Sequence, residues 1–514
     1  MKHRHDLPLA VAAAGCLAAA LCLSATATAT AGTGLRRDGA SAPAAVVITG
    51  AASTLGVDGP FRLVVASDGR YRLELGGPLP QVTGWDGTTA WDRDWNGTSR
   101  PLHLRDRDQA VLDGLFLAGA WPDADDGGRL VWSASVPREG GGVQRPFTHG
   151  DRGLHGAADV DAEGRLVAFR VGVGDKLRET AYRGERDFGG VRWPAVVEQT
   201  SDSGETVTLR AEEVTVLDAP KAVTAALAPA IGPAADHRFL ADLPADLEIF
   251  RAPSGHLLVH PLLDGRDVGW FIFDTGAGAL CLDNAAADSL GYAGFGEITA
   301  KGVGGDVKSA FYRGASLQLG PLVMDDPAYV GLDLQFLSGY FGKPLAGVLG
   351  YGVLARAVVE FDHQAPRIAL HDRTTYPGTD LTWTPLFLFG RHPCVPGAFE
   401  GHDAVFRLDT GADGTLTFHQ PTVERLGLLR NRRVQDTQLG GVGGFVAAKK
   451  GPVAWVELGG RRFEHVEAAF ALAEEGAFAD AATDGNVGNE LLDDFLLVFD
   501  YGGMRMALTP RPGN

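Results

Sequence analysis

Two aspartates stand in nearly identical surroundings, and their side chains could do acid–base chemistry together. Asp274 lies in the segment FIFDTGAGALCLD (Phe271 to Asp283), and Asp409 lies in FRLDTGADGTLTF (Phe406 to Phe418). Two carboxyl groups about 3 Å apart cannot both ionise, so they share one proton. One can then activate a water molecule as a base while its neighbour delivers a proton as an acid. Such a pair can hydrolyse a peptide bond without a metal or a covalent intermediate.

The residues that follow each aspartate suit a rigid loop. Glycine lets the chain turn tightly, and a threonine hydroxyl can hydrogen bond to the backbone of the loop. Four residues are therefore expected to support the two carboxylates: Thr275, Gly276, Thr410 and Gly411. The next residues, Ala277 and Ala412, carry no hydroxyl that could stabilise a charged carboxylate. The sequence therefore predicts a mildly acidic rather than a strongly acidic pH optimum.

The surroundings of the two aspartates repeat over a long stretch of chain. A glycine cluster follows each aspartate, at Gly302–Gly305 and at Gly441–Gly444, and each copy closes with a similar segment, Gly347–Asp362 and Gly485–Asp500. At each landmark the second copy follows the first by nearly the same number of residues. This internal repeat predicts two half-domains that bring equivalent strand ends together about a pseudo-two-fold axis.

From about Glu248 to Thr509 the chain resembles the pepsin and retropepsin superfamily of aspartic proteases, on the paired Asp-Thr-Gly-Ala motifs and the repeat. The resemblance implies that Asp274 and Asp409 form the catalytic dyad at the floor of a cleft. It also implies one β-hairpin flap per half, as in the retroviral dimer. The expected flap-tip residues are Gly302, Gly304, Gly305, Gly441, Gly443 and Gly444.

The same family packs a hydrophobic-hydrophobic-Gly element behind each catalytic loop. Val348-Leu349-Gly350 matches this element, whereas its second copy, Asn486-Val487-Gly488, departs from it by one polar residue. The resemblance therefore leaves open how tightly the second loop is held.

The region before the repeat has a different pattern. From about Val46 to Asp218, short runs of alternating polarity are separated by turn residues, which predicts an antiparallel β meander. Within it, Gln109 to Gly119 has apolar residues at helical spacing. Around Gly84 to Trp91 the region resembles the half-barrel of bacterial lipoprotein carriers. With 70 glycines among 514 residues, the whole chain is predicted to be mainly β.

These observations predict five successive parts. They are a signal peptide (1–31), an amino-terminal β domain (46–218), an Ala/Pro-rich linker (219–247), and the two halves of the repeat (248–372 and 373–514). A basic start at Met1–His5, followed by an apolar run from Leu7 to Leu23, is typical of an export signal. The protein is therefore expected in the periplasm or the medium. Ala14-Gly15-Cys16 offers the alternative of a lipid anchor at Cys16.

The composition excludes several classes of function. A net charge of −18 disfavours nucleic-acid binding, and no metal or organic cofactor is expected. Asp92–Gly97 begins like a calcium loop, but His103 stands where that loop requires Glu, so a hairpin turn closed by Asn96-Gly97 is favoured. His256 and His260 are interpreted as ordinary strand residues that share one face.

Two cysteines follow the predicted leader, Cys281 and Cys394. Export permits a disulfide between them, and the alternative is two buried thiols.

Three functions fit the sequence. The first is an aspartic endopeptidase that acts on peptides or proteins outside the cytoplasm, as a monomer with an intramolecular pseudo-dimer. The second is a non-catalytic envelope protein whose amino-terminal domain binds a lipid, a lipoprotein segment or a peptide. In the third, the amino-terminal domain is an inhibitory pro-segment.

Overall fold

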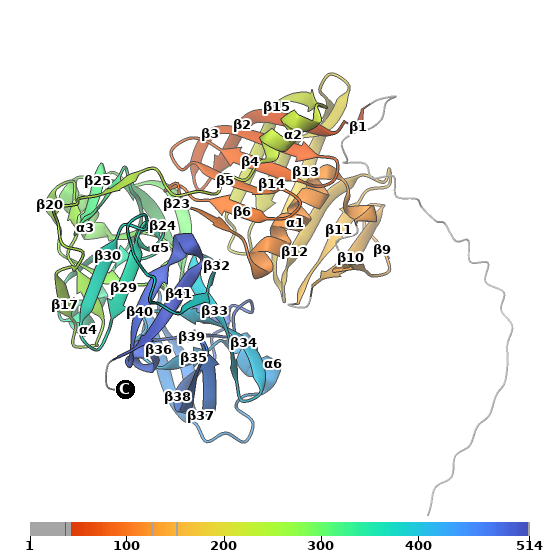
Figure 1. The fold of residues 1–514 in the computed structure, drawn as a ribbon. Coiled ribbons are helices and arrows are strands. Elements are labelled where there is room, and N and C mark those ends of the chain that lie inside the picture. The colour runs from red at the N-terminus through yellow and green to blue at the C-terminus, as the bar shows by residue number, and fades with distance from the viewer. Residues whose placement is uncertain (1–35, 38–42, 125–127, 151–152, 512–514) are drawn as a thin grey trace, which may run out of the picture.

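The structure is a computed structural model that describes residues 36–37, 43–124, 128–150 and 153–511. The predicted signal peptide and Cys16 lie outside these residues. The described chain forms an amino-terminal domain followed by two β lobes (Figure 1). This architecture confirms the predicted class, which is mainly β with a duplicated second part.

The amino-terminal domain is a fifteen-stranded antiparallel sheet over the described residues. Its main path runs β7-β6-β5-β4-β3-β2-β15-β14-β13-β12-β11-β10-β8, so most neighbours in the sheet are also neighbours in sequence, as the predicted meander requires. The strands are β1 (Arg36–Arg37), β2 (Ala45–Thr54), β3 (Val57–Ala66), β4 (Tyr71–Leu75), β5 (Gln81–Trp85), β6 (Ala90–Arg93), β7 (Ser99–Pro101), β8 (Leu130–Trp132), β9 (Val136–Pro137), β10 (Val143–His149), β11 (Leu154–Val160), β12 (Leu166–Val173), β13 (Lys176–Asp187), β14 (Val191–Thr200) and β15 (Thr206–Leu217).

One long helix, α1 (Leu104–Ala118), packs against this sheet at β3, β5 and β6. Its apolar face belongs to the domain core, where the Phe116 ring stacks on Phe169 with centroids 4.1 Å apart. The helix ends at Gly119, whose left-handed backbone (φ 67°) suits glycine. The predicted helical segment is therefore confirmed, with a start several residues earlier.

The predicted hairpin at Asn96-Gly97 is also present, between β6 and β7. Asp94 Oδ1 accepts hydrogen bonds from the backbone N–H groups of Asn96 (3.1 Å) and Thr98 (2.9 Å). This carboxylate therefore stabilises the turn.

Residues 219–247 connect the amino-terminal domain to the lobes and contain two short elements. Helix α2 (Pro220–Leu227) buries Val223 and Leu227 against the amino-terminal sheet. Strand β16 (His237–Phe239) pairs with β26 (Leu322–Asp325) of the first lobe. The segment therefore contacts both parts that it joins.

The first lobe combines an eight-stranded sheet, β17-β18-β21-β28-β22-β27-β24-β23, with the five-stranded sheet β16-β26-β25-β19-β20. Its elements are β17 (Ile249–Arg251), β18 (Leu257–Val259), β19 (Leu262–Leu263), β20 (Arg266–Asp267), β21 (Trp270–Phe273), β22 (Cys281–Asp283), α3 (Asn284–Leu290), β23 (Phe295–Gly302), β24 (Gly305–Arg313), β25 (Ser316–Leu319), β26 (Leu322–Asp325), β27 (Ala328–Leu332), α4 (Ser338–Phe341), β28 (Leu345–Leu349) and α5 (Tyr351–Leu354).

The second lobe has the eight-stranded sheet β32-β33-β34-β39-β35-β38-β37-β36. Its last six strands follow the same order as β21-β28-β22-β27-β24-β23 in the first lobe, so the sequence repeat is also a repeat of topology. The elements are β32 (Phe387–Phe389), β33 (His392–Phe399), β34 (His402–Leu408), β35 (Leu416–Phe418), α6 (Gln420–Leu426), β36 (Gln435–Gly441), β37 (Gly444–Leu458), β38 (Arg461–Ala471), β39 (Gly485–Val487) and α7 (Asn489–Leu492).

A further five-stranded sheet joins the two lobes, in the order β30-β29-β40-β41-β31. Its centre is the antiparallel pair of β29 and β40, which are the closing strands of the two repeat copies. The strands are β29 (Val358–Asp362), β30 (Arg367–His371), β31 (Trp383–Pro385), β40 (Phe495–Asp500) and β41 (Arg505–Pro510). One apolar core extends through both lobes and includes Phe273, Phe361, Phe406 and Phe499.

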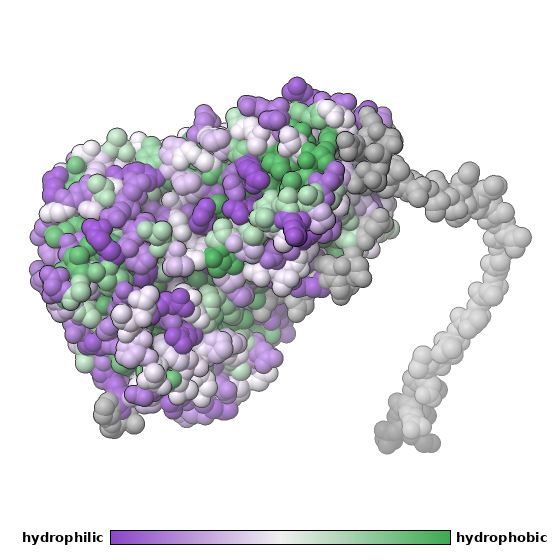
Figure 2. All heavy atoms as spheres, turned by 45° about the horizontal axis from the view of Figure 1, so that its top comes forward, coloured by the Kyte–Doolittle hydropathy of each residue, from purple (hydrophilic) through white to green (hydrophobic). Residues whose placement is uncertain are grey.

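The amino-terminal domain and the lobes form one continuous surface on the face in Figure 2. Among the described residues, no helix is long and apolar enough to cross a membrane. Cys281 and Cys394 are both free thiols, so they are not joined by a disulfide in this structure.

Candidate active site

The two Asp-Thr-Gly loops meet between the lobes. Asp274 follows β21 and Asp409 follows β34, and each of these strands has a parallel neighbour that extends the ladder to the aspartate. The N–H of Asp274 donates to the Leu349 carbonyl (2.9 Å), and the N–H of Asp409 donates to the Val487 carbonyl (2.9 Å). The repeated strands therefore hold both aspartates in the same way.

Thr275 and Thr410 lock the loops to each other. The N–H of Thr275 donates to Thr410 Oγ1, and the N–H of Thr410 donates to Thr275 Oγ1, each at 2.9 Å. Each hydroxyl then donates across to the opposite strand, Thr275 to the Leu408 carbonyl (2.6 Å) and Thr410 to the Phe273 carbonyl (3.0 Å). These four buried hydrogen bonds fix one loop relative to the other.

Glycine is needed at Gly276 and Gly411 because the backbone of each loop passes too close to the carboxyl group of the opposite loop to carry a side chain. A Cβ atom at Gly276 would lie 2.4 Å from Asp409 Oδ1, and one at Gly411 would lie 2.4 Å from Asp274 Oδ1. Neither glycine has a positive φ, so the tight turn expected from the sequence is not the reason for glycine here. Each glycine N–H also donates to the carboxylate of its own loop, at 2.6 Å to Asp274 and 3.0 Å to Asp409.

The two carboxyl groups are partly buried, each lies against the glycine of the opposite loop, and each shifts the pKa of the other. Burial and the charge of Asp409 raise the pKa of Asp274 well above its usual value. Burial also raises the pKa of Asp409, but the hydrogen bond from Asp274, the Gly411 N–H and the charge of Arg407 oppose that rise. The shared proton therefore belongs on Asp274, and the negative charge belongs on Asp409.

Asn486, which departs from the family pattern, contacts the charged carboxylate directly. Its Nδ2 donates to Asp409 Oδ2 (2.8 Å), and its Oδ1 accepts from His419 Nε2 (3.1 Å). The equivalent residue of the first half, Val348, packs in an apolar cluster instead. The second loop is thus held by a polar contact that the repeat pattern did not predict.

His256 also supports the second loop. It lies just before β18, where its Nε2 donates to the Gly411 carbonyl (2.8 Å) and its Nδ1 accepts from Ser254 (2.9 Å). His260, after the same strand, stacks on Trp270 with ring centroids 4.7 Å apart. Neither histidine is a strand residue as interpreted from the sequence, because β18 covers only Leu257–Val259.

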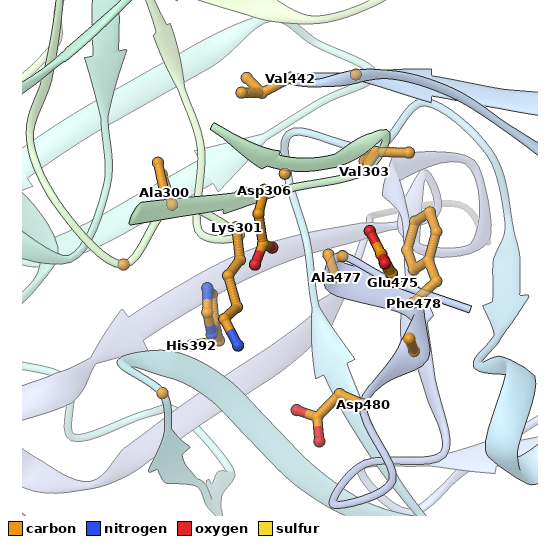
Figure 3. Close-up of a pocket in the computed structure, with 18 of the residues that line it drawn as sticks. Ala300, Lys301, Val303, Asp306, His392, Val442, Glu475, Ala477, Phe478 and Asp480 are labelled. Carbon is orange, nitrogen blue, oxygen red and sulfur yellow. The ribbon is translucent and has the colours of Figure 1, made fainter. Parts of the chain in front are cut away.

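The predicted flaps are the hairpins β23–β24 and β36–β37, and their tips touch. The N–H of Gly304 donates to the Val442 carbonyl (3.0 Å), and a Cβ atom at Gly304 would lie 2.2 Å from the Gly443 carbonyl carbon. Figure 3 shows Val303 and Val442 on the flap side of the cavity, with His392 and Asp480 opposite them. The glycine clusters thus allow two hairpins to meet at the cavity that both aspartates line.

The cavity between the flaps and the dyad has a volume of about 2000 Å³. Besides both aspartates, residues of the amino-terminal domain line it, namely Arg105 and Gln109 of α1, the β12–β13 turn and Ser201–Ser203. Direct contacts hold this wall: Lys176 Nζ donates to the Glu474 carbonyl (2.9 Å), and Lys301 pairs with Asp202 (3.5 Å). No sequence pattern had indicated that the first domain reaches the cleft.

Two topologically equivalent β lobes, with paired Asp-Thr-Gly loops between them and a hairpin over each, define the bilobal aspartic-protease class of fold. A scan against family models agrees, since residues 259–353 and 395–491 match the model described as "Aspartyl protease". The chain therefore contains an aspartyl protease domain in two segments, which correspond to the two halves of the repeat. The resemblance stated from the sequence is confirmed.

Solved structures with similar parts were also found, although the TM-scores are low. The aspartic proteinase from Irpex lacteus is 12% identical, with 52% of this chain and 96% of that chain covered and a TM-score of 0.32. A retropepsin-like aspartic protease from Rickettsia conorii is 18% identical, with 25% and 95% covered and a TM-score of 0.19. A LolA superfamily protein from Nitrosomonas europaea is 14% identical, with 35% and 87% covered and a TM-score of 0.25. A search of curated protein sequences found no match.

Proposed function

We propose that the chain is an aspartic endopeptidase that acts on peptides or proteins outside the cytoplasm. The observation that carries the proposal is the pair of partly buried carboxyl groups, Asp274 and Asp409, which shift each other's pKa in a cleft that two hairpins also line. Burial raises the pKa of both groups, and the Gly411 N–H and the charge of Arg407 oppose that rise at Asp409, so the two groups differ in protonation as acid and base catalysis by one pair requires.

In the proposed reaction, a water molecule between the carboxyl groups loses a proton to Asp409 as its oxygen attacks the peptide carbonyl carbon. Asp274 gives its proton to the carbonyl oxygen, which forms a tetrahedral diol. The C–N bond then breaks as the amine nitrogen takes the proton from Asp409, and a proton of the diol returns to Asp274. The dyad is thereby restored without any other group.

The flaps supply the substrate contacts in this proposal. An extended peptide can add as a strand along a hairpin edge, because backbone N–H and C=O groups bind any sequence in that conformation. The tips line the same cavity as Asp274 and Asp409, so closing them on a peptide excludes water from the dyad and strengthens its electrostatic interactions.

The test is cleavage of a denatured protein from about pH 3 to 7, the range expected for a proton-sharing pair. Wild type is compared with Asp274→Asn and Asp409→Asn, and with Asp325→Asn as a matched control on an exposed ion pair with Arg238. We expect both dyad variants to lose activity and the control to keep it. Activity that survives in either dyad variant would refute the shared dyad.

The amino-terminal domain offers less support for a lipid ligand. Its cavity beside α1, about 260 Å³, is lined by charged groups that include the ion pairs Arg100–Asp92 (3.0 Å) and Arg178–Asp113. An acyl chain needs an apolar lining, so these charges favour a structural role for the cavity. The domain's contacts with the cleft connect it to the protease reaction instead.

A further inference from the structure

The two repeat copies differ in character at one cross-strand pair of residues beside the dyad. In the first lobe Ile272 of β21 lies opposite Val348 of β28, and both side chains are apolar and buried. In the second lobe the equivalent pair is Arg407 of β34 and Asn486 of β39. All four residues line the same cavity. One side of the cleft therefore has an apolar wall and the other has a cationic and polar wall.

Asp480 is the carboxylate that Arg407 contacts, and its oxygens are already engaged. Arg407 Nη2 pairs with Oδ2, while Oδ1 forms an ion pair with Arg105 Nη1 (3.3 Å) and accepts from the Ala482 N–H (2.9 Å). Although burial alone would raise the pKa of Asp480, the charges of Arg407 and Arg105 hold it at about 2. Two guanidinium groups thus share one ionised carboxylate.

The group beside Asp480 that lacks a hydrogen-bond partner is a donor of Arg407. Arg407 is only 7% exposed, and its Nε has no hydrogen-bond partner among the described residues. Both guanidinium groups lie over the Phe389 ring, at 5.4 Å for Arg105 and 5.8 Å for Arg407. A buried donor without an acceptor is destabilising unless a ligand supplies one.

Among the other titratable groups near Arg407, Asp409 carries the negative charge of the dyad, so what Arg407 offers a ligand is its unpartnered Nε donor and not an excess of positive charge. Burial and the charge of Arg407 lower the pKa of His392 to about 3, so this ring is neutral. Asp106 is engaged by Arg100 (3.4 Å) and by the Gly390 N–H (3.4 Å). Glu424, Glu474 and Glu475 also line the cavity, but their side chains are exposed to solvent, which screens their charges.

Resting on the proposed protease function, we infer that the cleft beside Asp409 binds a carboxylate of the substrate and that Arg407, aided by Arg105, selects it. A carboxylate is planar and offers two acceptor oxygens, which suits paired guanidinium donors. It could come from a Glu or Asp side chain or from the terminal carboxyl group of a peptide. Because Arg105 lies on α1, the amino-terminal domain takes part in choosing the substrate.

The experiment measures kcat/KM on peptides with blocked ends that differ at one position, with Glu, Gln or Leu placed at each position around the cleaved bond. A hydrogen bond to a charged group contributes about 1.5–3 kcal/mol, so we expect about a tenfold to hundredfold preference for Glu over Gln at one position. A second set with free or amidated carboxyl termini separates a terminal carboxylate from a side chain. No preference for a carboxylate in either set would overturn the inference.

Substitutions of Arg407 and Arg105 test whether these residues cause the preference for Glu over Gln. Arg407→Ile copies Ile272 of the first lobe, and we expect the Glu-to-Gln ratio to fall to about one while the Leu peptide gains. Arg105→Gln changes only the partly exposed guanidinium group on α1, and we expect it to lower the Glu-to-Gln ratio in part. This variant still tests the inference if Arg407→Ile does not fold. Arg238→Gln, on the exposed ion pair with Asp325, is the matched control and should keep the wild-type ratio. An unchanged ratio in both cleft variants would refute the assignment.

A binding experiment tests the carboxylate site even if the protein has no protease activity. The same Glu and Gln peptides, carrying a fluorophore, are titrated with Asp274→Asn and their binding is followed by anisotropy. Preferential binding of the Glu peptide that Arg407→Ile abolishes in this background supports the carboxylate site even when no cleavage is seen. Equal binding of both peptides overturns the site whatever the activity.

Discussion

At the scale of single residues, Asn486 and Asp274 determine how the dyad is charged. Asn486 donates to Asp409, whereas the equivalent Val348 gives nothing to Asp274. The prediction of a mildly acidic optimum considered only the missing hydroxyls of Ala277 and Ala412. The structure adds a donor that arrives from a different strand, so it could not be found by inspecting the loop sequence alone.

Replacing Asn486 with Val, the residue of the first half, should move the acidic limb of the pH profile. A hydrogen bond to the charged form lowers a pKa, so its loss raises the pKa of Asp409 and the limb shifts to higher pH. A bond worth about 1.5–3 kcal/mol predicts a shift of about one to two pH units. The measurement is kcat/KM against pH, with Asn489→Ala as the comparison, because Asn489 contacts the Thr410 carbonyl instead (2.8 Å). A limb that stays in place would show that Asn486 only packs.

Asp274→Asn should stabilise the fold relative to wild type, and this gain in stability should increase as the pH rises. The raised pKa of Asp274 means that the folded protein keeps a proton that the unfolded chain releases above about pH 3.9. Wild type therefore loses up to about 1.4 kcal/mol per pH unit between that value and the folded pKa, and asparagine cannot ionise. The gain in Tm over wild type is expected to grow from pH 4 to pH 7, while the exposed Asp325→Asn control shows no trend. A gain independent of pH would contradict the assigned protonation state.

At the scale of elements, the repeat made much of the site predictable. The Asp-Thr-Gly loops, the two flap hairpins and the closing strands all lie where the repeated landmarks placed them, because equal spacing in sequence produced equal strand order in both lobes. The reason for glycine at Gly276 and Gly411 was different from the one expected, since the limiting contact comes from the opposite loop. The roles of His256 and Arg407 depend on such contacts across the chain, which local patterns do not encode.

Gly304→Ala should separate the flap tips. Its Cβ atom would lie 2.2 Å from the Gly443 backbone, which cannot move without displacing the second hairpin. We expect a several-fold rise in KM and faster hydrogen exchange at residues 295–313 and 435–458. Gly232→Ala serves as the control, because a Cβ atom there meets nothing within 4 Å. Unchanged exchange in both segments would mean that the tips move independently.

At the scale of the whole molecule, the amino-terminal domain is fastened to both lobes. The Asn96 side chain donates to the Ala328 carbonyl (2.9 Å) and accepts from its N–H (2.8 Å), and Arg391 of the second lobe pairs with Asp92 (3.5 Å). The sequence predicted this domain as a separate meander, because strand alternation reports which face of a sheet is buried and says nothing of the partner that covers it.

These contacts predict that the domain stays bound when the connection is cut. A specific protease site introduced at residues 229–233 would divide the chain between the amino-terminal sheet and the first lobe. We expect the two parts to elute together in gel filtration, and Asn96→Ala to weaken that association by about 2 kcal/mol for two lost hydrogen bonds. Exposed Gln364→Ala is the control. Prompt separation of the wild-type parts would instead support a removable pro-segment.

The sheet that joins the lobes also determines when the site can form during synthesis of the chain. Its central pair, β29 and β40, joins the closing strands of the two repeat copies, and such long-range pairing is slow to form in folding. While the chain emerges from the ribosome, Asp274 has no partner with which to share a proton until the second copy, which carries Asp409, has been made. Under the proposed protease function, an incomplete chain therefore lacks the dyad, and the two carboxyl groups meet only once the second copy has paired with the first.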